Sequence, residues 1–180
     1  SSFLENSSKE DVGVDSWNSS DALSFYVKTD YLNVGFSNIG GGSIESYEIV
    51  DSGPNSYKYL GGYNNLDVYE DSIPVSLVLN NLLCSPCLSE DGGDVKKLYN
   101  LPFDTLVEGP AYLLGNDKTI SVSGEDSLVF VFEFVGDGVK VIKKTTFYGN
   151  KFLVNHDYEI FKSNNNYKGL SVDWLGGSRD

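Results

Sequence analysis

Residues 127–161 read SLVFVFEFVGDGVKVIKKTTFYGNKFLVNHDYEIF, and this stretch decides the fold. Its first segment, Leu128–Val135, is apolar at consecutive positions, which predicts a central strand that is buried on both faces. Glycine-containing turns at 136–138 and 149–150 tolerate positive φ. They divide the stretch into three predicted strands, over Leu128–Val135, Val139–Tyr148 and Phe152–Phe161.

An asparagine turn at 164–166 then predicts one more strand over Tyr167–Leu175. Three consecutive hairpins form an antiparallel meander. The chain also contains 19 glycines, 12 tyrosines and 10 phenylalanines but no methionine, a composition that favours strands and tight turns over helices. The sequence therefore predicts an all-β protein with a twisted antiparallel β-sandwich.

The N-terminal part shows the same period of two. Alternation over Leu23–Lys28 and Leu32–Ser37 predicts two half-buried strands, and Ile39-Gly-Gly-Gly-Ser43 predicts a turn into a returning strand over Ile44–Val50. Residues 1–21 are rich in serine and acids without periodicity, so we expect a flexible linker there and a domain over residues 22–180. Between residues 50 and 118 only short strands are predicted, at Tyr57–Leu60, Leu66–Tyr69 and Val75–Leu79.

The predicted core comes from the apolar positions of these strands. It contains Phe25, Val34, Phe36, Phe130, Phe132, Phe134, Val154 and Trp174.

The charge of the chain excludes some partners. There are 26 acidic and 13 basic residues, a net charge of −13. Such a surface repels phosphate backbones and anionic lipid headgroups, so we expect neither nucleic-acid binding nor peripheral membrane binding.

The two cysteines stand together as Cys84-Ser-Pro-Cys87. One interpretation is a redox-active pair, but the helix that would lower the pKa of the first thiol is not visible in the pattern. The pattern favours the other interpretation, a local disulfide or two inert thiols. A loop this short would add little stability, so we expect that changing both residues to serine leaves folding nearly unaltered.

No catalytic, cofactor-binding or metal-binding residue is predicted. His156 is the only histidine, and strand parity places it with Phe152, Val154 and Tyr158 toward an apolar layer, as expected of a hydrogen-bonded core residue. The glycine run at 40–42 lacks the Gly-Lys-Ser/Thr ending of a phosphate loop. The acidic loops at 89–94 and 124–126 lack the alternating ligand spacing of a calcium loop.

The stretch Val27–Ser46 carries a resemblance to a known family. It resembles the opening of the large first periplasmic domain of the YidC family of bacterial membrane protein insertases, in which a strand ends in Thr-Asp and the next strand ends in Phe-Ser before a Gly-Gly turn. Later stretches, Asp137–Phe147 and Phe152–Ile160, are similar to the family's next strands. The matching positions are Thr29, Asp30, Leu32, Phe36, Ser37, Gly40, Gly41, Ile44 and Ser46, and near the end Trp174, Gly176 and Gly177.

The resemblance implies a β-supersandwich like that of galactose mutarotases, in the periplasm and anchored to the inner membrane of a Gram-negative bacterium. It implies a non-catalytic docking module, without cofactors, that supports insertion and folding of nascent inner-membrane proteins with the Sec translocon, particularly SecDF. In this interpretation residues 1–21 follow a transmembrane helix, and the chain stops before the family's last strands and C-terminal helix. The pair Cys84/Cys87 departs from the family.

Two alternatives remain open at this point. One is a sugar-binding or mutarotase-like sandwich, and the other is a thiol-redox protein using Cys84 and Cys87. A mutarotase mechanism pairs a general base with a general acid, usually a glutamate and a histidine, and draws on further histidines. Since this chain has a single imidazole, we expect no epimerase or hydrolase activity.

Overall fold

Two β-sheets pack face to face in the computed structural model, which describes residues 11–18, 20–51, 53, 55–64, 66–78, 86–90, 98, 100–136, 138–162 and 170–173. The predicted fold class, an all-β protein with a sandwich of antiparallel sheets, is confirmed. The described part contains one short 3₁₀ turn, η1 (Ala111–Leu113), and no helix in it is long and apolar enough to cross a membrane.

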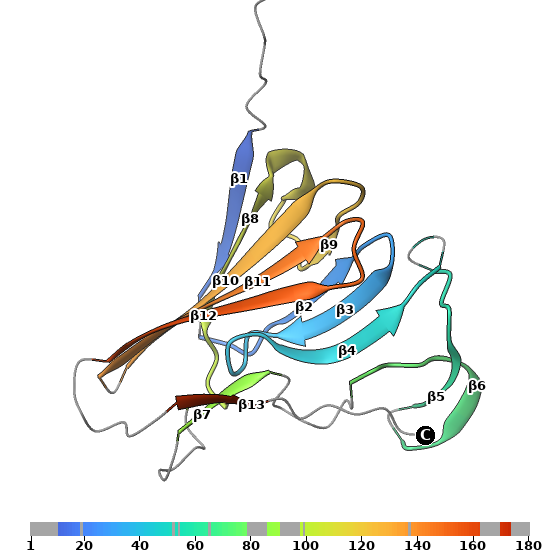
Figure 1. Ribbon diagram of the computed structural model, residues 1–180, viewed down its shortest axis with the longest axis horizontal. Coiled ribbons are helices and arrows are strands. Elements are labelled where there is room, and N and C mark those ends of the chain that lie inside the picture. Colours follow the sequence, from blue (N-terminus) through green and yellow to red (C-terminus); the bar gives the residue numbers. More distant parts are fainter. Residues whose placement is uncertain are drawn as a thin grey trace, which may run out of the picture.

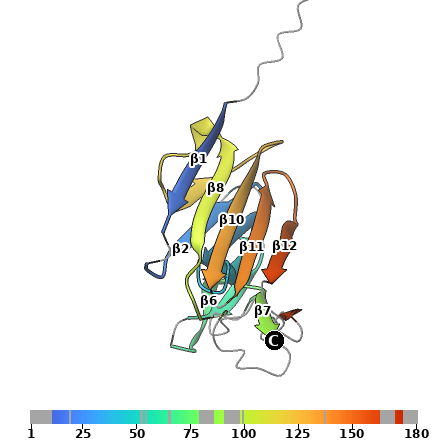
Figure 2. The ribbon, with the colours of Figure 1, turned by 90° about the vertical axis from the view of Figure 1, so that its left-hand side faces the viewer.

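The larger sheet has five antiparallel strands, which lie side by side in Figure 2. In spatial order they are β1 (Val12–Trp17), β8 (Asp104–Pro110), β10 (Ser127–Gly136), β11 (Val139–Tyr148) and β12 (Val154–Lys162). The hairpins β10–β11 and β11–β12 are the first two that the sequence predicts.

The second sheet has four strands, in the order β4 (Ser43–Ile49), β3 (Leu32–Ser37), β2 (Ser24–Lys28) and β9 (Thr119–Ser121). The pair β2–β9 is parallel, and the other two pairs are antiparallel. Two small two-stranded sheets complete the described part, namely β5 (Leu60–Tyr63) with β6 (Tyr69–Pro74), and β7 (Cys87–Glu90) with β13 (Leu170–Asp173) (Figure 1).

Phenylalanine rings fill the space between the two large sheets. The Phe36 ring of β3 lies 4.8 Å from that of Phe130 on β10 and 5.3 Å from that of Phe147 on β11, measured between ring centroids. Phe25 of β2 meets Phe130 at 5.6 Å. Edge-to-face and offset contacts at these distances are the preferred geometries of aromatic pairs, so this cluster holds the sheets together.

Most of the predicted core is confirmed. Phe25, Val34, Phe36, Phe130 and Phe132 are buried, and Phe134 and Val154 are partly buried against the same cluster. Trp174 lies outside the described residues.

The predicted start of order at Ala22 is wrong. Val12–Trp17, inside the expected linker, forms β1 and pairs along its whole length with β8. Its inward side chains include Trp17, whose ring packs edge-on against Phe25 at 5.1 Å. The serine- and acid-rich composition hid a strand of which only Trp17 packs against the core.

Two predictions about strand burial are also wrong. Val135 on β10 is 68% exposed, and Val129 and Val131 are half-buried, because only one face of this strand meets the other sheet. Conversely, all of β3 is buried although its sequence alternates. The Tyr26 ring and the Ser46 hydroxyl cover Gly35 on the outer face.

The predicted third hairpin is wrong as well, since β13 pairs with β7 and not with β12. In the middle of the chain the strands start later than predicted. Tyr57 and Ser76 form isolated bridges, whereas β5 begins at Leu60 and β6 at Tyr69.

Candidate binding pocket

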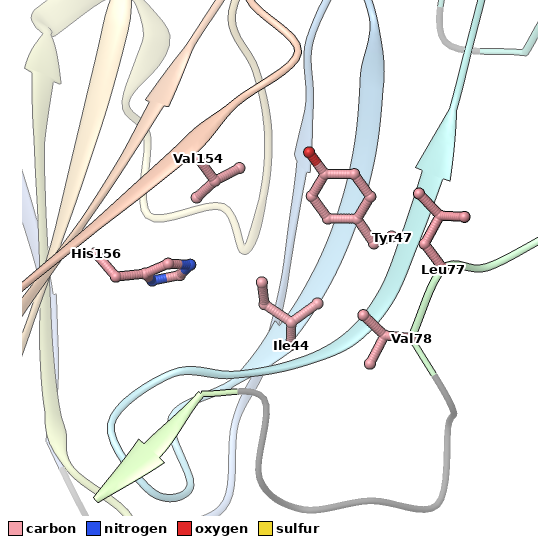
Figure 3. Close-up of a pocket in the computed structure, with 6 residues that line it drawn as sticks. All are labelled: Ile44, Tyr47, Leu77, Val78, Val154 and His156. Carbon is pink, nitrogen blue, oxygen red and sulfur yellow. The ribbon is translucent and has the colours of Figure 1, made fainter. Parts of the chain in front are cut away.

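A pocket of about 280 Å³ opens between the two large sheets, where β12 and β4 stand at neighbouring edges (Figure 3). Three elements line it: β12, β4 and the segment that follows β6. The lining side chains are Ile44, Tyr47, Leu77, Val78, Val154 and His156, and most of the lining surface is apolar.

A β-bulge gives β4 its two lining side chains. Ile44 and Tyr47 are three residues apart, so a regular strand would point them to opposite faces. The register shifts between Gly35 and Phe36 of β3, so that Gly35 pairs with Ser46 and Phe36 with Ile44. Glu45 is the extra residue, and both lining side chains turn inward as a result.

The edge of β4 that faces away from β3 is covered by the segment at 76–78. The Tyr47 backbone N–H donates to the Ser76 hydroxyl at 3.0 Å, and the Leu77 N–H donates to the Tyr47 carbonyl at 2.8 Å. These bonds hold Leu77 and Val78 over the pocket. On the opposite side, β12 pairs only with β11 among the described strands, so its outer edge stands next to the opening.

The two polar side chains of the pocket are already engaged. The Tyr47 hydroxyl donates to the Phe152 carbonyl at 3.0 Å, and burial raises the pKa of Tyr47. The Nδ1 of His156 lies 3.2 Å from the Thr145 hydroxyl. Burial and, to a smaller extent, the charge on Lys143 together lower the pKa of His156 to about 3. At neutral pH the pocket therefore holds no charge, which suits an apolar group.

Behind His156, on the inward face of β11, lies a lysine that the sequence analysis missed. Lys143 is fully buried, and its ammonium donates to the Gly42 carbonyl at 3.0 Å, between the rings of Phe132 and Tyr158 at 5.7 Å from each. Burial lowers the pKa of Lys143 to about 7. The signal was present in the sequence, because strand parity places Lys143 in the inward row with Val141 and Thr145.

Tyr158 completes this buried group. Its hydroxyl has no hydrogen-bond partner within the described part of the chain, and burial raises its pKa. Neither Lys143 nor Tyr158 lines the pocket. They lie behind the pocket wall and therefore do not offer reactive groups to a ligand.

Of the described motif residues from the resemblance, Ile44 lines the pocket. The others lie at turns, in the core or, in the case of Ser46, on β4. The Thr29 hydroxyl accepts from the N–H of Tyr31 and Leu32 at the β2–β3 turn, and the Asp30 carboxylate accepts from the Gly124 N–H at 2.9 Å. At the β3–β4 turn the Ser37 hydroxyl accepts from the Ile39 N–H, and Gly40 and Gly41 have positive φ. Phe36 is in the aromatic core.

The remaining predicted positions fall outside the part of the chain that the structure describes. Trp174, Gly176, Gly177 and Cys84 lie outside the described residues, and so does the side chain of Cys87 at the start of β7. No cluster of three or more potential metal ligands occurs in the residues that the structure describes.

In comparisons with known proteins, no family model, curated protein or solved structure matched this chain.

Proposed function

We propose that the protein is a non-catalytic binding module that takes up an extended polypeptide segment at the outer edge of β12. The segment adds a strand to the five-stranded sheet and inserts one large apolar side chain into the pocket. The observation that carries this proposal is the position of an apolar pocket directly beside the outer edge of β12, a nine-residue strand whose outer edge pairs with no other described strand.

Strand addition is a recurring mode of peptide recognition, in which backbone hydrogen bonds supply affinity and side-chain pockets supply selectivity. A long unpaired edge offers a row of N–H and C=O groups for this purpose. The pocket volume of about 280 Å³ lies just below the ~300–1,000 Å³ typical of small-molecule sites. It therefore fits one side chain better than a whole cofactor.

The chemistry of the pocket supports a module without catalysis. A general base works best when its pKa is near the working pH. His156 has a pKa of about 3 and is bound to Thr145, so it is a weak base. Lys143 is closer to the useful range but is enclosed by Phe132 and Tyr158.

The test is an NMR titration of the labelled protein with a seven-residue peptide of threonines and glutamines around a central tryptophan. We expect amide shifts concentrated on β12 and on residues 76–78. The variant Val154→Trp fills the pocket, so we expect it to remove these amide shifts. The control Val135→Trp makes the same change at an exposed position, so we expect it to retain them. Shifts scattered over both sheets, or equal binding by the two variants, contradict the proposal.

The resemblance to the YidC family adds a finer proposal, that the module belongs to a membrane protein insertase and that SecDF is its partner in the periplasm. Its support is the order and spacing of the motifs between Thr29 and Ser46 and between 137 and 160. A photo-crosslinking residue at position 155, on the edge strand, is expected to capture purified SecDF, while one at position 135 is not. Failure at both positions removes the insertase assignment and leaves the general binding module intact.

A further inference from the structure

We infer that the segment bound at β12 is cationic, with a basic residue next to the apolar residue that enters the pocket. This inference rests on the proposed function and names the class of its partner.

The two faces of β12 differ in chemistry. Its inward row contains Val154 and His156, which line the pocket. Its outward row is exposed to solvent and consists of Asn155, Asp157, Glu159 and Phe161. An added strand alternates in the same way, so a residue that faces the pocket has chain neighbours that lie beside Asn155 and Asp157 on the outer face.

The outward row carries negative charge that β11 compensates only in part. Lys144 of β11 pairs with Glu159 at 3.5 Å. Asp157 also lies opposite Lys144 in the register. It forms no ion pair with Lys144 or with any further residue that the structure describes. A lysine or arginine on an added strand would meet this carboxylate from the open side, whereas an acidic residue there would be repelled.

The end of the outward row adds a second attraction for cations. Phe161 is 53% exposed, and an exposed aromatic face attracts ammonium and guanidinium groups. The net charge of −13 steers a cationic segment toward the protein from a distance. The same charge opposes a second copy of this chain and any phosphate-bearing partner, so a basic polypeptide is the occupant that fits.

The experiment compares three seven-residue peptides that share a central tryptophan and differ only in the two residues beside it, which are lysine, glutamine or glutamate. Affinity is measured by NMR titration at low salt and again in 0.5 M NaCl, where the Debye length is only a few ångströms, ~4 Å. We expect the lysine peptide to bind about five- to tenfold more tightly than the glutamine peptide and the glutamate peptide to bind most weakly. Salt should abolish this order.

Two charge variants locate the effect. Asp157→Asn with Glu159→Gln should remove the preference for lysine. Asp71→Asn with Asp117→Asn changes the net charge equally at exposed positions away from β12, and it should retain the preference. Equal loss in both variants shows that the attraction is general and overturns the inference.

The outcomes also separate the two proposals. If no peptide shifts the β12 amides, the proposed function fails and the inference fails with it. If all three peptides bind at β12 with equal affinity, only the inference is overturned.

Discussion

His156 offers a simple test of the buried environment behind the pocket. As the only histidine, it gives the only imidazole signals in an NMR spectrum, so its titration needs no assignment. With a pKa of about 3, the ring should stay neutral from pH 8 down to pH 4. A normal titration midpoint near 6.5 would contradict the described burial.

The two causes of the lowered pKa of His156 can be separated experimentally. Burial is the larger cause and the charge on Lys143 is the smaller one. We therefore expect Lys143→Met to raise the pKa of His156 while leaving it below 6.5. Lys144→Met, its exposed neighbour, is the matched control and should leave the titration of His156 unchanged.

Lys143 also predicts how stability changes with pH. Its pKa is about 7 in the folded protein against an ordinary value of 10.5. Between these values the unfolded chain binds a proton that the folded protein does not, so the free energy of unfolding rises as the pH increases from about 7 to about 10.5. Below pH 7 both states are charged, and this contribution is constant.

The measurement is urea unfolding at pH 7, 8 and 9. The native protein should become more stable over this range, and Lys143→Met should show a smaller increase. In Lys144→Met the increase should match that of the native protein. Identical slopes in all three proteins would mean that the folded state accommodates the Lys143 charge without penalty.

At the scale of elements, the β3–β4 turn requires glycine at position 42 both for its backbone conformation and for its close contact with the core. Gly42 has a φ of +86°, and a Cβ at this position would collide with the Phe132 ring in the core. Gly124 also has positive φ, at +58°, but has open space around it. An alanine at Gly124 therefore introduces backbone strain alone, whereas an alanine at Gly42 introduces backbone strain together with overpacking.

We expect Gly124→Ala to lower the free energy of unfolding by about 1–2 kcal/mol, the usual cost of a left-handed alanine. Gly42→Ala should cost a further 1–3 kcal/mol or so, because the ring must move within a packed core. Thermal or urea unfolding of both variants gives the comparison. Equal costs would show that Phe132 relaxes freely.

The sequence predicts pairs of strands that are neighbours in the chain better than pairs of strands that are far apart in the chain. The hairpins β10–β11 and β11–β12 are joined by short turns, so alternation and turn residues suffice to predict them. The partners of β13 and β9 lie far away in the chain, and no local pattern reports them. The pocket depends on the bulge at Glu45, a shift of register with no residue signature of its own, so the sequence analysis had no means to find it.

At the scale of the whole molecule, β1 adds an edge strand to the larger sheet. A chain that starts at residue 22 lacks the whole of β1 and therefore leaves the edge of β8 unpaired and the Phe25 ring without its contact to Trp17. Loss of the Trp17 contact alone should reduce the free energy of unfolding by about 1.5–3 kcal/mol.

The matched control starts at residue 11 and retains β1, so it should keep the stability that the β1–β8 pair provides. Urea unfolding of the three proteins provides the test. Equal stability of the chain that starts at residue 22 would show that β1 contributes nothing to the stability of the sandwich.

The parallel pair β2–β9 and the edge pair β1–β8 have a consequence for biosynthesis. The register joins Val12 to Pro110 and Tyr26 to Thr119, so both N-terminal strands find partners that are translated much later. With roughly 90 residues between partners and synthesis at ~5–20 residues per second, each strand leaves the ribosome roughly 5–20 s before its partner exists. During that interval the nascent chain exposes strand edges that have no partner, so the newly synthesised protein is open to aggregation for longer than its small size suggests.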